Sequence, residues 1–162
     1  MYSKLLTIAT TLCFSIGVYA QSPIELAQRA NNYFMAKWSD PTTPTNFKKL
    51  RPSNLWTRGV YYEGLMALYE IDADVRYIDY TDRWANFHQW TPRNGVKTND
   101  ADDQCCGQTY MDRYMQSGGD EKIAKVLENL NNQMQTPNDK KLEAEGSLYG
   151  WWTWIDAIQM AM

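Results

Sequence analysis

Residues 98–110 read Thr-Asn-Asp-Ala-Asp-Asp-Gln-Cys-Cys-Gly-Gln-Thr-Tyr, and this stretch predicts the opening of a helix. Asn99 or Asp100 can cap free backbone N–H groups, and Asp102 and Asp103 then fall in the first turn, where the helix dipole favours negative charge. Small and apolar residues follow at helical spacing, at Cys106, Gly107, Tyr110 and Tyr114. Taken by itself, the stretch is explained by an acidic cap on a helix that packs closely against a neighbour.

A second carboxylate stands out near the end of the sequence. Asp156 lies within Trp151-Trp-Thr-Trp-Ile-Asp-Ala-Ile-Gln-Met-Ala-Met162, among aromatic and aliphatic residues. An acid in such a segment is costly to bury unless it is hydrogen-bonded or functional. Asp102 and Asp103 have a polar setting and Asp156 an apolar one, a contrast that can give two carboxyl groups different roles in one active site.

The rest of the chain predicts helices separated by short polar breaks. Helices are expected over residues 22–38, 53–71, 73 or 74 to 90, 98–117 and 120–135, with a sixth over 151–162 and a Pro- and Thr-rich break over 39–52. The first, third and fifth are amphipathic, whereas the second, fourth and sixth are apolar, aromatic or rich in small residues. This alternation is typical of helical hairpins that form an outer and an inner ring. No strand pattern competes with it, so the predicted fold class is all-α.

The second predicted helix has almost no polar face, which predicts that it is buried all round. It also contains Gly59 and Gly64. Because glycine weakens a helix, its use at these positions predicts close approach of another backbone.

The first 20 residues predict a cleavable signal peptide. Lys4 is followed by an apolar run from Leu5 to Val18 and by the small-residue site Val18-Tyr19-Ala20. The mature chain is then expected to be one domain, residues 21–162, in the periplasm or secreted, with no membrane association after cleavage. A retained N-terminal anchor is the alternative.

Composition narrows the class of partner. The formal net charge is −3, and removal of Lys4 with the leader makes the mature chain more acidic still. A mildly acidic chain without a basic stripe is not expected to bind nucleic acid. Cys105 and Cys106 are adjacent, a spacing that suits neither a disulfide framework nor a zinc site, so no metal or other cofactor is expected. Aromatic residues make up 14 %, which suits both a sugar-binding surface and an ordinary core.

Four motifs resemble a known family. They are Leu55-Trp-Thr-Arg-Gly-Val-Tyr-Tyr-Glu-Gly-Leu-Met-Ala-Leu-Tyr69, Trp90-Thr-Pro-Arg-Asn-Gly95, Ala101-Asp-Asp-Gln-Cys-Cys-Gly-Gln-Thr-Tyr110 and Trp151-Trp-Thr-Trp-Ile-Asp-Ala-Ile-Gln-Met160. In this order they resemble the unsaturated glucuronyl and rhamnogalacturonyl hydrolases of glycoside hydrolase families 88 and 105, and are more similar to family 105. The resemblance implies a six-hairpin α/α barrel, of which this chain holds about the first three hairpins, the N-terminal half of a truncated domain.

The resemblance also implies a reaction and its substrate. Members act on unsaturated uronic-acid oligosaccharides left by polysaccharide lyases, here expected to derive from rhamnogalacturonan. They hydrate the C4=C5 enol ether, and the hemiketal that results opens to release the next sugar. By motif, Asp156 is the acid that protonates C4 and the base that activates water, and its aromatic surroundings are expected to raise its pKa.

Other residues receive roles from the same resemblance. The second aspartate is assigned to Asp102, expected to stay ionised at the helix N-terminus, with Asp103 as its competitor and as a substrate-binding candidate. Further candidates are Arg58, for the uronate carboxylate, and Trp152 and Trp154, for stacking on the sugar. His88 is interpreted as structural.

Two other classes stay open. One is a different α/α-barrel carbohydrate enzyme, such as an epimerase or endo-acting glycosidase, which would require a catalytic His or a Glu pair. The other is a non-catalytic carbohydrate-binding or helical interaction protein, which needs no acid in an apolar site. Because only about half of the expected barrel is present, the fragment is expected to expose an apolar patch and to self-associate through it. Because it lacks the remaining inner helices, it is also expected to be inactive.

Overall fold

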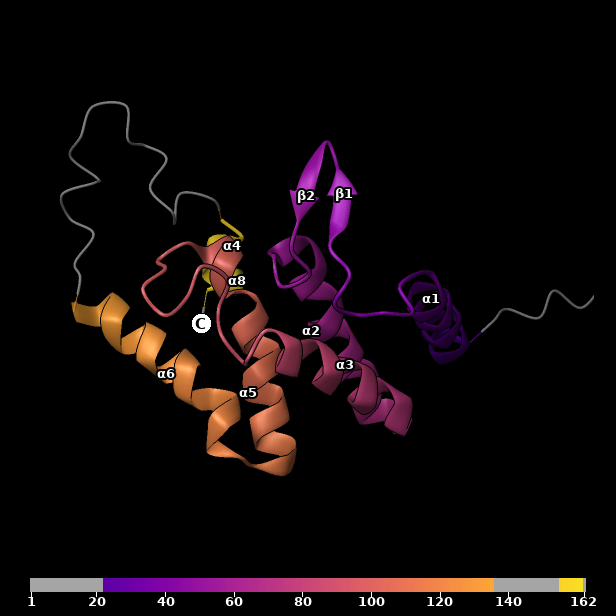
Figure 1. Ribbon diagram of the computed structural model, residues 1–162. Coiled ribbons are helices and arrows are strands. Elements are labelled where there is room, and N and C mark those ends of the chain that lie inside the picture. Colours follow the sequence, from indigo (N-terminus) through magenta and orange to yellow (C-terminus); the bar gives the residue numbers. More distant parts are fainter. Residues whose placement is uncertain (1–21, 136–154, 162) are drawn as a thin grey trace, which may run out of the picture.

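The computed structural model describes residues 22–135 and 155–161, and these residues are mainly helical, as predicted (Figure 1). The predicted leader, together with Trp152 and Trp154, lies outside the described residues. The elements are α1 (Pro23–Lys37), β1 (Thr45–Phe47), β2 (Lys49–Arg51), α2 (Trp56–Ile71), α3 (Val75–Phe87), α4 (Ala101–Gln104), α5 (Cys106–Ser117), α6 (Asp120–Gln135) and α8 (Ala157–Met160).

Local sequence signals set the beginnings of these helices. Ser22 and Glu25 form a capping box at the start of α1, in which each side chain accepts a hydrogen bond from the other residue's backbone N–H. Asp74 caps α3 by accepting from the N–H of Arg76 at 2.9 Å. The expected helix over 98–117 is divided, because α4 ends at Gln104 and α5 begins at Cys106.

The third predicted helix ends earlier than expected. It was predicted to continue to Trp90, but α3 stops at Phe87, and both Gln89 and Trp90 have left-handed φ angles, 55° and 52°. This turn brings the Trp90 ring into the core, where it lies 5.4 Å from the ring of Tyr110 and is only 5 % exposed. Burial of a large aromatic side chain thus offsets the strain of a non-glycine residue in this region.

The predicted break over 39–52 contains two strands, so the expectation that the chain has no strand is wrong for this segment. β1 and β2 pair antiparallel, with Thr45 opposite Arg51 and Phe47 opposite Lys49. The turn between them is formed by Lys48, whose φ of 59° allows a very tight reversal. Strands this short carry too few residues for an alternating pattern to be visible in the sequence.

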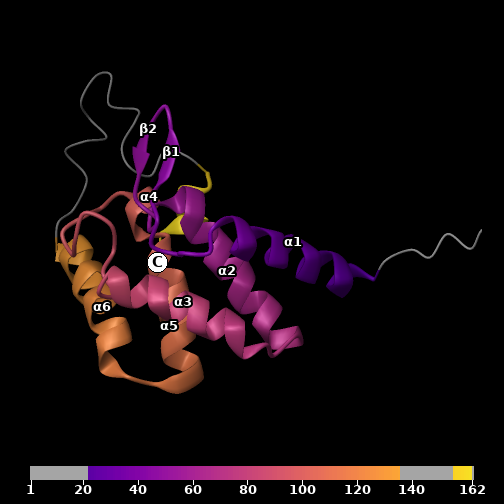
Figure 2. The ribbon, with the colours of Figure 1, turned by 45° about the vertical axis from the view of Figure 1, so that its right-hand side comes forward.

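The helices pack in the inner and outer arrangement that the alternation predicted. α2 contacts α1, α3, α4 and α5, whereas α6 packs on α5 and α8 packs on α4 (Figures 1 and 2). The core between α2, α3 and α5 is largely aromatic, and the rings of Tyr62 and Trp84 stack with their centroids 3.8 Å apart. Trp84 also donates its indole N–H to the carbonyl oxygen of Ser53 at 2.9 Å, so the start of α2 is tied to α3.

The two glycines of α2 differ in their surroundings. A Cβ atom at Gly59 would lie 3.1 Å from the sulfur of Cys105, which confirms the predicted close approach. Gly64 has no described atom within 4 Å of the corresponding position, so the same prediction is wrong there. Cys105 and Cys106 are buried and free, in keeping with their interpretation as small residues at a close contact.

One face of α2 is open, so the prediction that this helix is buried all round is wrong for the described part of the chain. Trp56 is 38 % exposed, Val60 41 % and Ile71 67 %. We call these three residues the open face of α2. Among the described residues, no helix is both long and apolar enough to cross a lipid bilayer.

Candidate active site

The packing of α4 against α8 brings together the two segments in which the carboxylates were predicted. Ala101 and Cys105 form a small buried cluster with Ala157, Met160 and Ala161. Small side chains let the two short helices approach closely. Asp102 and Asp156 are therefore neighbours in space, close enough for the charge of Asp156 to act on the titration of Asp102.

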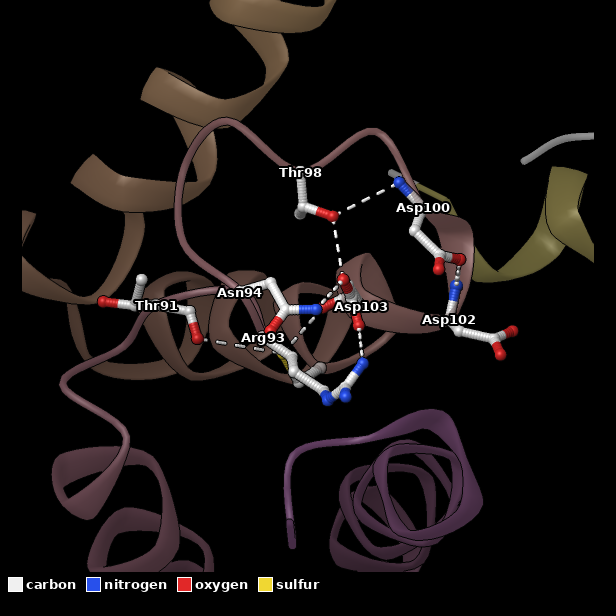
Figure 3. Close-up of polar contacts among 8 residues, drawn as sticks. Thr91, Arg93, Asn94, Thr98, Asp100, Asp102 and Asp103 are labelled. Atoms are coloured by element: carbon white, nitrogen blue, oxygen red, sulfur yellow. Dashed lines mark hydrogen bonds and ion pairs between the residues drawn. The ribbon is translucent and has the colours of Figure 1, made fainter. Parts of the chain in front are cut away.

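Asp103 is buried and fully engaged, with its side chain 2 % exposed. One carboxylate oxygen accepts from Arg93, and the other accepts from Asn94 Nδ2 at 2.8 Å and Thr98 Oγ1 at 2.9 Å. Figure 3 shows these donors converging on Asp103 from the loop that precedes α4. Both oxygens are used within the protein, so Asp103 shapes this loop and leaves little capacity to bind a substrate.

Helix α6 also contacts the loop that precedes α4. Asn129 is completely buried and donates from Nδ2 to the carbonyl oxygens of Val96, at 2.9 Å, and Thr98, at 2.7 Å. Its Oδ1 accepts from Gln104 Nε2 at 2.9 Å, which connects α6 to the end of α4. These hydrogen bonds tie α4 and the loop before it to α6, while the buried Oε1 of Gln104 forms no hydrogen bond with the described residues.

Asp102 differs from Asp103 in its burial, in its hydrogen bonds and in the direction of its side chain. It is half-buried, its carboxylate has no hydrogen-bond partner among the described residues, and Figure 3 shows that it points away from Asp103. Burial raises the pKa of Asp102, and the nearby charges of Asp100, Asp103 and Asp156 raise it further. The shift of this pKa is upward, against the effect expected from a helix N-terminus, because burial and like charges act on Asp102 in the single-turn helix α4; that Asp102 is ionised stays a prediction.

Asp156 is exposed at the start of α8, whereas the sequence predicted apolar surroundings for it. The reason is geometric. In this single turn Ala157 and Met160 take the buried positions, so the residue before them faces outward. The catalytic assignment of Asp156 stays a prediction, as does the stacking role of Trp152 and Trp154.

Glu63 holds α8 in place, and no role was predicted for it. Its two oxygens accept from Gln159 Nε2 at 3.0 Å and from the thiol of Cys105 at 3.1 Å. Gln108 of α5 adds a hydrogen bond from its Nε2 to the carbonyl oxygen of Gln159. Glu63 lies in the motif from Leu55 to Tyr69, but its contact partners are distant in sequence and could not be read from it.

Arg58 lies apart from the acids. It is 3 % exposed, and its guanidinium donates to the carbonyl oxygens of Thr43, at 2.7 Å, and Pro41, at 3.0 Å. It also lies 4.7 Å from the ring centroid of Trp38. These contacts are on the flank of α2 next to α1 and the β1–β2 hairpin, whereas Glu63 faces α8. The structure therefore does not bring Arg58 into the group formed by Asp102 and Asp156, and its contact with a uronate remains a prediction.

His88 has a structural environment. Its Nε2 lies 2.7 Å from Ser53 Oγ, and its ring packs against Trp84. Burial, and then the charge of Arg58, lower the pKa of His88 to about 4. A histidine held neutral in this way suits the structural interpretation made from the sequence.

Comparison with known proteins places this arrangement in a family. The model of Glycosyl Hydrolase Family 88 matches residues 26–162. Two solved structures share the fold. A polysaccharide lyase, BACCELL_00875, is 22 % identical with a TM-score of 0.65, and the match covers 85 % of this chain and 37 % of that one. A glycosyl hydrolase family 88 protein from Bacteroides vulgatus is 24 % identical with a TM-score of 0.64, covering 85 % of this chain and 38 % of that one.

This chain therefore spans less than two-fifths of the length of either solved structure. The search of curated proteins gave no match. The helical hairpins described above are part of the α/α barrel of this family. The matched residues include every described helix except the beginning of α1, and on this ground the chain belongs to Glycosyl Hydrolase Family 88.

Proposed function

We propose that the barrel to which these hairpins belong hydrolyses unsaturated uronyl oligosaccharides, the products of polysaccharide lyases. The observation that carries the proposal is the pairing of Asp102 and Asp156 at the starts of two helices, α4 and α8, that pack on each other. Family membership supports glycoside hydrolysis in general. The unsaturated substrate, its origin in rhamnogalacturonan, and export to the periplasm or medium are our proposals.

The reaction needs one group that serves first as acid and then as base. The carboxylic acid of Asp156 gives its proton to C4 of the unsaturated uronate. Water adds at C5 and returns a proton to the Asp156 carboxylate, so that one water molecule has added across the double bond. The resulting hemiketal at C5 opens by cleavage of its bond to the ring oxygen, and the hemiacetal exposed at C1 then releases the next sugar.

Asp102 is the better second carboxylate, because Asp103 is occupied by Arg93, Asn94 and Thr98. The carboxyl of Asp102 is free to bind a substrate hydroxyl or to orient water. Burial, and then the charges of Asp100, Asp103 and Asp156, raise the pKa of Asp102. Asp156 is exposed, so a substrate can reach its carboxyl.

Substitution of the two acids tests the assignment, in a chain completed with the remaining hairpins of a close relative. Asp156→Asn should reduce turnover by about 10²–10⁴-fold, because an amide can neither protonate C4 nor activate water. Asp102→Asn should lower activity through both KM and kcat if this residue orients the substrate. Asp79→Asn, at an exposed acid on α3, is the matched control and should leave activity unchanged.

The assay is the loss of ultraviolet absorbance as the unsaturated uronate is consumed, with rhamnogalacturonan-derived and glycosaminoglycan-derived disaccharides compared. Unchanged turnover in Asp156→Asn would refute its role. If the protein binds these disaccharides but the absorbance of none of them falls, the result would favour a carbohydrate-binding protein. A rise in absorbance from a saturated acidic polysaccharide would show a lyase, and either of these two results would overturn the proposed hydrolysis.

A further inference from the structure

Glu63 lies on α2 and faces the two short helices at whose starts the candidate acids lie. Its Oε1 accepts a hydrogen bond from the thiol of Cys105, the residue that ends α4, at 3.1 Å. Its Oε2 accepts from Nε2 of Gln159, on α8, at 3.0 Å. Helices α4 and α8 also pack on each other (Figures 1 and 2). A single carboxylate on a 16-residue helix therefore contacts both segments that carry the acids.

Each of these two contacts is made one helical turn beyond an acid. Cys105 lies three residues after Asp102, and its backbone N–H donates to the carbonyl oxygen of Ala101 at 3.1 Å. Gln159 lies three residues after Asp156, and its backbone N–H donates to the carbonyl oxygen of that residue at 3.0 Å. Residues three apart on a helix are neighbours on its surface. The two contacts are therefore linked to the two acids through one turn of hydrogen-bonded backbone.

The two acids differ in what else holds them. Helix α4 is also tied to α6, through the hydrogen bond between Gln104 and Asn129. The side-chain hydrogen bonds that reach α8 within the described part of the chain all end on Gln159. Loss of the contact between α2 and Gln159 should therefore displace Asp156 and leave Asp102 in place.

The charge of Glu63 makes this contact sensitive to the residue opposite it. Glu63 is half-buried and forms no ion pair among the described residues, so neutral donors hold its carboxylate. A hydrogen bond to an ionised acceptor is stronger than one between two neutral groups. A second carboxylate in place of the amide of Gln159 would instead repel Glu63.

We propose that Glu63 is a positioning residue, which sets the spacing between Asp102 and Asp156 by holding α4 and α8 to α2. The effect on catalysis rests on the proposed function, in which Asp156 protonates the same sugar that Asp102 orients. Glu63 acts through the two helices and does not touch the substrate. A displacement of about 1 Å between catalytic groups can cost about 10²-fold in rate.

Reversal of the carboxylate and the amide tests the proposal, in the chain completed with the remaining hairpins. Gln159→Glu should lower kcat by about 10–100-fold and change KM by less than about threefold, because Asp156 moves and Asp102 does not. Adding Glu63→Gln again sets an amide against a carboxylate, and the oxygen of the new glutamine still accepts from Cys105. This double variant should return kcat to within about threefold of the unsubstituted chain.

Thiol labelling of the purified chain gives a second readout that needs no hydrolysis. Cys105 is completely buried in the cluster that α4 forms with Ala157, Met160 and Ala161, so displacement of α8 would uncover it. In Gln159→Glu, iodoacetamide should label Cys105 at least about tenfold faster than in the wild-type chain, and the double variant should reverse this. Cys106 packs in the other core cluster and should keep its rate, which mass spectrometry of the labelled peptide distinguishes.

The control variant is Gln135→Glu, which adds the same charge at an exposed position of α6 and should change neither readout. Unchanged kcat in Gln159→Glu, or a double variant that recovers the slow labelling without recovering kcat, would overturn the proposal. Loss of all turnover in Glu63→Gln alone would show a direct catalytic role and overturn it as well. Faster labelling of both cysteines in Gln159→Glu would show general unfolding, against a local displacement.

Failure of the proposed hydrolysis would be distinct from failure of this inference. If the completed chain consumes no unsaturated substrate, the proposed function is refuted. The labelling rate of Cys105 in the three variants still decides whether Glu63 holds α8, and equal rates in Gln159→Glu and the wild-type chain would refute that hold.

Discussion

Substitution of Asp103 by Asn should destabilise the protein far more than the same change at its neighbour Asp102. Asp103 accepts from Arg93 on one oxygen and from Asn94 and Thr98 on the other. An asparagine keeps the shape but has a single acceptor oxygen, so its NH₂ group must face one of these sets of donors. The change removes the ion pair and leaves a buried donor without an acceptor.

The magnitude follows from the burial of each partner. Breaking a fully buried ion pair typically costs about 3–5 kcal/mol. The side chain of Arg93 is 30 % exposed, so water can recover part of its solvation, and we expect a loss of about 2–4 kcal/mol. In a domain of this size that loss should lower the melting temperature by about 5–15 °C.

Asp102→Asn is the matched control for this change. The carboxylate of Asp102 forms no hydrogen bond among the described residues and lies near three other acids. Loss of its charge should therefore change stability by less than about 0.5 kcal/mol, or increase it slightly. Urea unfolding followed by tryptophan fluorescence measures both variants. Equal losses in the two, or a stable Asp103→Asn protein, would refute the division into a structural and a free carboxylate.

Three shorter predictions concern other parts of the fold. The pKa of His88 is lowered to about 4, so the stability that its neutral form contributes is present above pH 6.5 and is lost as the pH falls toward 4. His88→Gln should remove this loss of stability between pH 6.5 and 4. Urea unfolding of the wild-type protein and of the variant, measured across this pH range, checks the expectation. Gly59→Ala should destabilise the protein by about 1–3 kcal/mol, because the new methyl group would lie too close to the sulfur of Cys105. Gly64→Ala should stabilise the protein by up to about 1 kcal/mol, because no described atom lies within 4 Å of the new group. Thermal melts that rank the two variants the other way would contradict the packing described for α2. The open face of α2 should make the purified chain self-associate, and a monomer in light scattering, with a sharp thermal transition, would disprove this.

Much of the helical framework could be predicted because its signals are local. The capping box at Ser22 and the cap at Asp74 mark helix beginnings within a few residues of sequence, and the apolar spacing of each helix reports its buried face. The end of α3 could not be predicted in this way. It is decided by the burial of Trp90 against Tyr110, a contact between residues twenty positions apart.

For the site, the sequence by itself identified the family motifs and the segments that carry the acids, and it placed Asp102 and Asp103 at a helix beginning. It could not tell these two apart, because adjacent residues on a helix differ by about 100° in direction and only the surroundings distinguish them. The tertiary structure decided the matter by folding the 91–98 loop over one of them, so that Arg93, Asn94 and Thr98 surround Asp103 and leave Asp102 free. It likewise turned Arg58 toward α1 and the hairpin, since the direction of a side chain depends on which helices pack around it.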